Sequence, residues 1–233
     1  MNVENPGANS DVLKARVVKM GARALNMAVD ATYSLTHADR APAAKVLQAE
    51  QDVNQMDIDH EIESVALLTN QNRDADTVRR ILVAMRVNTE LERVADHATN
   101  IARRALEGAK LENQPLADML WEMVGLSSRM LGGALASLDQ ETSLHATNII
   151  EEDREINALR DSLKKKVQML LERKQLRPDS AITAILTAED IERMGDHATN
   201  IAEEVIFLTR GVVVKHHYKI ERERLPMSVQ LSK

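Results

Sequence analysis

Apolar residues recur at steps of three and four along most of the chain, a spacing typical of amphipathic helices. Prolines and polar runs divide this pattern into six long segments. The prolines at positions 42, 115 and 178 stand where helices are expected to begin, and polar runs at 70–76 and 139–142 mark the other breaks. The pattern predicts helices over residues 10–38, 42–69, 76–112, 115–139, 142–175 and 179–210, with Gly211 as a C-terminal cap.

Composition supports an all-α fold in which these helices form antiparallel neighbours. The 233 residues are 44% hydrophobic and 2% aromatic, with 8 Gly and 5 Pro, which disfavours a turn-rich β fold. A formal charge of -6 disfavours nucleic-acid binding, and the absence of Cys excludes disulfides, thiolate catalysis and sulfur-ligated metal sites. Because no stretch of the sequence is apolar over the length of a membrane span, we expect a cytoplasmic protein that meets membranes only through partners.

An internal repeat is the most informative feature. Residues 92–102 read ERVADHATNIA and residues 192–202 read ERMGDHATNIA, so 9 of 11 positions are identical at a spacing of 100. Residues 49–56 match residues 152–159 more loosely, at a spacing of 103. The sequence therefore predicts two tandem three-helix bundles with internal pseudo-two-fold symmetry: a first repeat over 1–113, a second repeat over 114–211 and a tail over 212–233.

The repeated segment places two carboxylates one helical turn apart, in both copies. Glu92 lies four residues before Asp96, and Glu192 lies four residues before Asp196. Like charges at this spacing repel by a few tenths of a kcal/mol, roughly, so their duplication points to a cation that offsets the repulsion. That cation is either a metal ion or the neighbouring arginine, Arg93 or Arg193.

The preceding helix of each repeat adds a second pair of oxygen donors four residues apart. Antiparallel packing would bring these donors to the repeated segment, giving each repeat three carboxylates and one amide. Oxygen donors of this kind suit Mg, Ca, Mn or Fe ions, and Zn where His97 or His197 joins. We call the two sets the first strip (Glu50, Asn54, Glu92 and Asp96) and the second strip (Asp153, Asn157, Glu192 and Asp196).

Other interpretations of these residues are less specific. The strips could be ordinary solvated ion pairs. Asp57 lies three residues before His60, but the second repeat has no such pair, and His216 with His217 suits a surface extension. The chain lacks the Glu-x-x-His of ferritin-like di-iron proteins, a phosphate-binding glycine loop and a nucleophile elbow.

The doubled motif, ELERVADHATNIA at 90–102 and DIERMGDHATNIA at 190–202, resembles that of the PhoU family of phosphate-transport regulators, as does the Met20-Gly21 pair. The resemblance extends from about Val12 to Leu208. It implies that the two strips hold multinuclear clusters of Fe, Zn, Mn or Mg. Because Asn54 and Asn157 stand where the family motif has an acid, each cluster would lack one negative charge and hold metal more weakly.

The same resemblance implies a function for the whole chain. It implies a cytoplasmic, homodimeric negative regulator of phosphate uptake and of the phosphate-starvation response that is not an enzyme. Such a protein would act as a metal-binding adaptor between the Pst phosphate ABC transporter and a PhoR-type sensor histidine kinase. Two alternatives remain open at this point: a carboxylate-bridged, metal-dependent phosphohydrolase, and a purely structural helical scaffold.

Overall fold

Six helices make up the part of the fold that the structure describes. The computed structural model describes residues 6–69, 74–144 and 146–214, and every regular element in these ranges is α-helical. The expectations for residues 1–5, for 70–73 of the polar run and for the tail from 215 onward lie outside the described residues. The helices are α1 (Pro6–His37), α2 (Arg40–Leu68), α3 (Ala75–Leu106), α4 (Gln114–Asp139), α5 (Ala146–Glu172) and α6 (Pro178–Arg210).

Local capping explains where several helices begin and end. The Asp74 carboxylate accepts from the Thr77 N–H at 2.6 Å before α3, and Asn113 accepts from the Leu116 N–H at 3.2 Å before α4. Gly211 ends α6 in the left-handed conformation, with φ 67°, as expected. The predicted helix over 76–112 is too long because α3 ends at Leu106, two residues before Gly108 adopts φ 94°.

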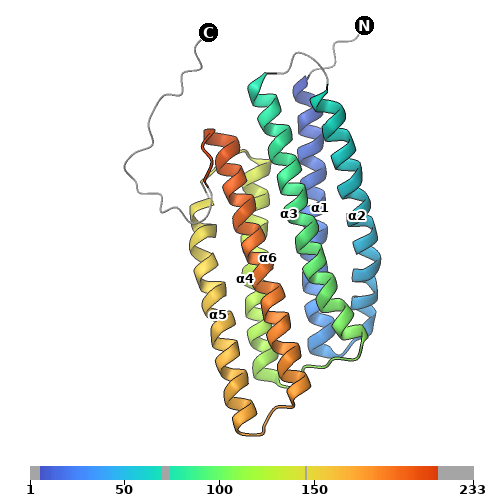
Figure 1. Cartoon of the computed structure of the whole chain (residues 1–233), viewed down its shortest axis with the longest axis vertical. Coiled ribbons are helices and arrows are strands. Elements are labelled where there is room, and N and C mark those ends of the chain that lie inside the picture. Colours follow the sequence, from blue (N-terminus) through green and yellow to red (C-terminus); the bar gives the residue numbers. More distant parts are fainter. Residues whose placement is uncertain (1–5, 70–73, 145, 215–233) are drawn as a thin grey trace.

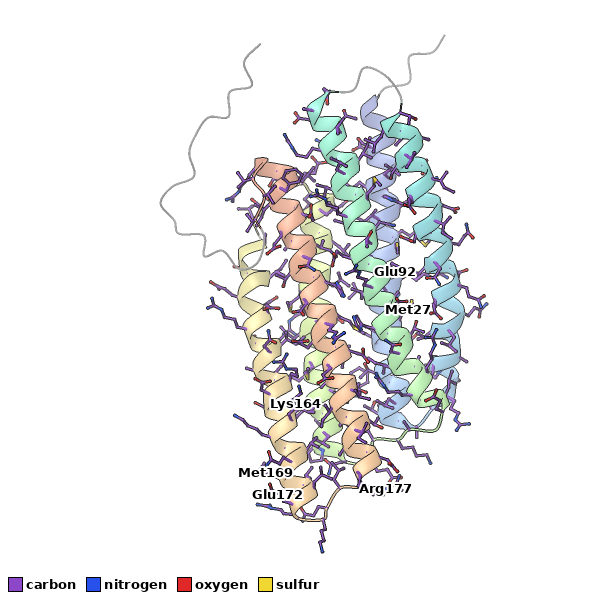
Figure 2. The ribbon with its side chains drawn as sticks, in the orientation of Figure 1. Met27, Glu92, Lys164, Met169, Glu172 and Arg177 are labelled. Carbon is purple, nitrogen blue, oxygen red and sulfur yellow. The ribbon has the colours of Figure 1, made fainter. Side chains whose placement is uncertain are left out.

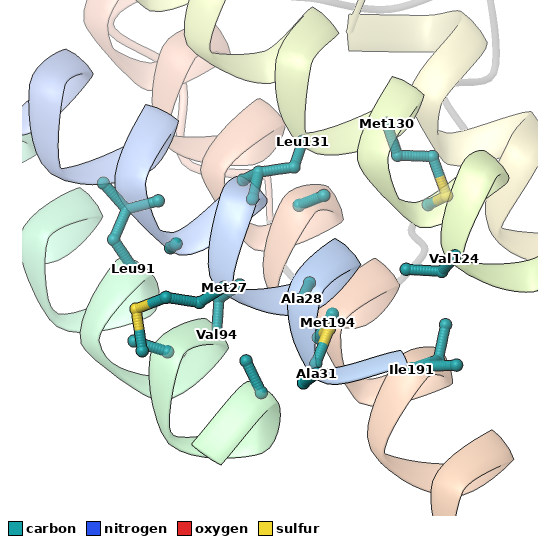
Figure 3. Packing of buried hydrophobic residues seen from close by; sticks show 14 of the residues in the cluster. Met27, Ala28, Ala31, Leu91, Val94, Val124, Met130, Leu131, Ile191 and Met194 are labelled. Carbon is teal, nitrogen blue, oxygen red and sulfur yellow. The ribbon is translucent and has the colours of Figure 1, made fainter. Parts of the chain in front are cut away.

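The two repeats are separate three-helix bundles that share one core. Helices α1, α2 and α3 pack together, α4, α5 and α6 pack together, and the bundles meet through α3 against α6 and α1 against α4 (Figure 1). Buried side chains from α1, α3, α4 and α6 meet in a continuous apolar cluster (Figure 3). The two-repeat, all-α prediction is confirmed. None of the helices in the described ranges is apolar over a long enough stretch to cross a membrane.

Gly21 sets how closely α1 approaches α4. A Cβ atom added to Gly21 would lie 2.5 Å from Leu135 Cδ1, whereas one added to Gly132 would have nothing within 4 Å. Since Gly21 and Leu135 are both buried, the absence of a side chain at Gly21 lets the two repeats come into close contact here.

Gly21→Val should destabilise the protein by about 1–3 kcal/mol, because the added methyl groups overpack the contact with Leu135. The matched variant Gly132→Val should stay within about 0.5 kcal/mol of the wild type, because its side chain enters open space. Urea unfolding of both variants checks this, and Leu135→Ala should recover part of the loss in the Gly21→Val background. Equal stability of the two valine variants would contradict the role assigned to Gly21.

Candidate functional site

Two stacked histidines lie at the junction of α3 and α6. His97 Nδ1 lies 2.9 Å from Asp190 Oδ1 of the opposite repeat, and His197 Nδ1 lies 2.7 Å from Glu90 Oε2. The two rings stack with centroids 5.5 Å apart and planes at 28°. Because both histidines and both acids are spaced by 100 residues, each contact is the pseudo-symmetric copy of the other.

Further side chains hold the two acids of this junction. Arg104 Nη1 lies 2.6 Å from Asp190 Oδ2, and the Asn200 amide donates to Glu90 Oε2 at 2.9 Å. Burial alone would raise the pKa of Glu90, but hydrogen bonds from His197 and Asn200 outweigh it and hold that pKa below its usual range. His97 and His197, considered above as zinc ligands, thus serve the contact between the repeats.

The first strip gathers around Glu92. Burial raises the pKa of Glu92, and the negative charges of Asp96 and Asp57 raise it further against the opposing charge of Arg93. Asp57 comes from α2, where its Oδ1 accepts from the Asn88 amide at 2.5 Å. Burial also raises the pKa of Asp57. The α2 carboxylate that faces Glu92 is therefore Asp57, a residue that the strip predicted from the sequence did not include.

The remaining two members of the first strip have other surroundings. Glu50 Oε1 accepts from Arg103 Nη2 at 2.9 Å, so its charge is offset within the protein. Asn54 is exposed on α2. The structure thus brings Glu92 and Asp96 together, adds Asp57 to them, and pairs Glu50 with an arginine.

The second strip brings three carboxylates together. The Asn157 amide donates to the Asp153 backbone oxygen at 2.9 Å and to Asp153 Oδ2 at 3.3 Å. Burial, with the nearby charges of Glu192 and Asp153, raises the pKa of Asp196 to about 6, despite the opposing effect of His197. Asp153, Glu192 and Asp196 therefore lie close enough to repel one another.

The second strip differs from the first in having an arginine that pairs directly with the glutamate of the repeated motif. Arg160 forms an ion pair with Glu192, and its charge also acts on Asp196. Lys164, one turn further along α5, lies 3.0 Å from Glu189 (Figure 2). At the repeat spacing of 103, Arg160 and Lys164 stand where the first repeat has Asp57 and Glu61. Beside the second strip, two basic residues of α5 thus replace two acidic residues of α2.

The strips as they stand are not closed metal cages. Within residues 6–69, 74–144 and 146–214, no group of three or more His, Asp or Glu side chains is arranged to hold a metal ion. The donors nevertheless suit a hard cation at the first strip, since burial and, after it, neighbouring carboxylates raise the pKa values of both Glu92 and Asp57. At the second strip, Arg160 already supplies positive charge to Glu192.

The chain is an all-α tandem-repeat protein. Its two helical bundles are related by a pseudo-two-fold axis, and each carries a carboxylate strip on its second and third helices. The particular family follows from comparison with known domains. The PhoU domain matches residues 17–105 and again residues 120–205. The chain belongs to the PhoU family, a family of regulatory accessory proteins rather than enzymes.

Named relatives agree with this assignment. The chain is 29% identical over 202 residues to the phosphate-specific transport system accessory protein PhoU homolog of Zymomonas mobilis, covering 85% of this chain and 84% of that one. It is 25% identical over 209 residues to the phosphate-specific transport system accessory protein PhoU of Escherichia coli K12, and the match covers 90% of this chain and 87% of that one. The crystal structure of PhoU from Pseudomonas aeruginosa, 24% identical, has the same fold with a TM-score of 0.83, covering 89% of this chain and 100% of that one.

Asp196 should make stability depend on pH. Its folded pKa of about 6 lies above the ordinary 3.8, so proton uptake stabilises the folded chain at low pH, and this contribution is lost as pH rises from about 4 through 6. Asp196→Asn should therefore gain stability over the wild type at pH 7 but not at pH 4. Because the carboxylate is partly exposed, we expect a gain of at most about 1 kcal/mol.

Urea unfolding of both proteins at pH 4 and pH 7 measures this difference, and carbon NMR of the Asp196 carboxyl should give a midpoint near 6. Asp30→Asn, on α1, removes the same charge away from the strip and serves as the control. A gain at pH 7 that Asp30→Asn reproduces would show a general charge effect and contradict the assignment to Asp196.

Proposed function

We propose that this protein is a cytoplasmic, homodimeric negative regulator of phosphate uptake and of the phosphate-starvation response. It would connect a Pst phosphate ABC transporter to a PhoR-type sensor histidine kinase. The observation that carries the proposal is the match to the PhoU domain in both repeats, over most of the described chain. The names of its relatives, which describe accessory proteins of phosphate-specific transport, support the same role.

The proposal includes metal binding at the strips. Glu92, Asp96 and Asp57 would hold a divalent cation of the Mg, Mn, Fe or Zn class in the first repeat. The bound ion would supply positive charge to carboxylates that now repel one another. In the second repeat, Asp153, Glu192 and Asp196 offer a similar donor set, but a metal there would compete with Arg160 for Glu192. Glu50, Asn54 and Asn157 would complete the two sets if their side chains reorient.

Deletion of the gene should leave a phosphate-starvation reporter, such as alkaline phosphatase, active in medium rich in phosphate. The physical reason is the loss of the contact that keeps the kinase in its repressing state. Expression of the wild-type chain from a plasmid should restore repression. A deletion strain that remains repressed in rich medium would count against the regulatory role.

Metal affinity should be carried mainly by the first strip. The double variant Glu92→Gln/Asp96→Asn should bind Mn²⁺ about tenfold more weakly or worse, since two ligand charges are lost. The matched variant Glu192→Gln/Asp196→Asn should change affinity less, because a metal ion there has to compete with Arg160 for Glu192. Calorimetric titration with Mn²⁺ compares the two. Equal losses would contradict the asymmetry, and unchanged binding in both variants would exclude the strips as metal sites.

The phosphohydrolase alternative has its own test. Purified protein incubated with Mn²⁺ or Fe²⁺ and a phosphoester would have to show turnover that disappears in the Asp96→Ala/Asp196→Ala variant. We expect no turnover, because the family is one of accessory proteins rather than enzymes. Turnover abolished by that variant would replace the regulatory proposal with an enzymatic one.

A further inference from the structure

A groove of about 470 Å³ runs between α1 and α2, and it shares the lining residues His60 and Asn88 with the smaller hollow beside Asp57 and Glu92 of the first strip. One wall carries three basic side chains of α1, which share a helix face because they are three or four residues apart: Arg16, Lys19 and Arg23. The other wall comes from α2 and includes Asp52, Asp59 and His60, and Asn88 of α3 completes the lining.

The basic groups retain unused donor capacity. Arg16 Nη1 donates to Glu63 Oε2 at 2.5 Å, and Arg23 forms an ion pair with Asp52. Each guanidinium has five N–H donors and is substantially exposed, with 49% and 40% of the side-chain surface open. Lys19, which lies between them in the sequence, is exposed and makes no hydrogen bond or ion pair with the described residues.

The acids of the groove are already engaged. Asp52 holds Arg23, and Asp59 Oδ1 accepts from the Gln55 amide at 2.8 Å. The neutral amide leaves the charge of Asp59 in place, but the lining carries the three positive charges of α1 against the two negative charges of Asp52 and Asp59, and this balance favours an anionic ligand over a cationic one.

His60 adds a buried polar atom that lacks a partner. The residue is 2% exposed, its Nδ1 lies 3.4 Å from Ser64 Oγ, and its Nε2 has no hydrogen-bond partner in the described structure. Buried polar groups nearly always have a hydrogen-bond partner, so we infer that this nitrogen binds a water molecule or a ligand. When Ser64 donates its hydroxyl proton to Nδ1, Nε2 carries the ring N–H and becomes a donor toward an acceptor in the groove.

We propose that the α1–α2 groove binds a phosphoryl-type oxyanion, contacted by Lys19, by the free N–H groups of Arg16 and Arg23, and by His60 Nε2. A phosphoryl group carries several negatively charged oxygens that can accept from several donors at once. Hydrogen bonds between charged donors and charged acceptors are stronger than those between neutral groups. The volume is in the range of small-molecule sites, so the anion is either free phosphate or the phosphoryl group of a small metabolite.

Titration of the full-length protein at constant ionic strength tests the site, with inorganic phosphate and adenosine monophosphate as probes. Saturable binding of either probe, with a shift of the His60 side-chain nitrogen signal, is the expected result. Binding of phosphate alone assigns the site to the free ion, and binding of the nucleotide alone assigns it to a phosphoryl group on a larger ligand. Saturation by neither probe overturns the proposal.

Lys19→Glu should weaken binding about tenfold or more, because it places a like charge against the anion. Lys165→Glu, an exposed change of the same charge on α5, is the matched control and should bind as the wild type does. Since both lysines are exposed and neither forms a hydrogen bond or ion pair with the described residues, both variants should fold. Equal affinity in wild type, Lys19→Glu and Lys165→Glu would overturn the proposal. The result does not depend on the regulatory role, which is tested in cells.

Discussion

The contact between α3 and α6 is the interaction on which the arrangement of the two repeats depends. His97 reaches Asp190, His197 reaches Glu90, and the two rings stack between these pairs. Asp190 is buried and Glu90 is half-buried, so losing a histidine partner would leave either charge with fewer partners in a partly desolvated interface, which is more costly than losing an exposed ion pair. The hydrophobic effect that stabilises the apolar cluster is non-directional, so it does not specify how the helices align. These ion pairs determine which turn of α3 faces which turn of α6.

This junction changes the meaning of the repeated sequence. Identity between 92–102 and 192–202 first suggested a shared metal function, because a core does not require matching polar residues. The structure supplies a second cause: a pseudo-two-fold contact needs its histidine in both copies. The identity of His97 with His197 is explained by the junction alone. Glu92 and Asp96, which lie outside the described junction contacts, retain the metal interpretation.

Sequence periodicity was sufficient to predict six helices and their pairing into two bundles, because amphipathic spacing and proline position are local properties. The end of α3 was misplaced since nothing local in the sequence required Gly108 to adopt a left-handed conformation. Asp57 was missed for a different reason. Its proximity to Glu92 depends on the register between α2 and α3, which a spacing within one helix does not specify. Aligning the two repeats at the spacing of 103 would have shown that Arg160 occupies the position of Asp57 in the second repeat.

The two strips differ in charge because only the third helix of each repeat takes part in the junction. The junction involves the third helix of each repeat, so α3 and α6 keep the same motif, whereas α2 and α5 lie at the outer edges of the fold (Figure 1). These outer helices are free to diverge, and they do so in charge, with Asp57 and Glu61 against Arg160 and Lys164. A cation would therefore relieve repulsion at the first strip, while at the second it must displace an arginine. The nearly symmetric fold thus has one strip in which acids of two helices face each other and one in which Arg160 pairs with Glu192.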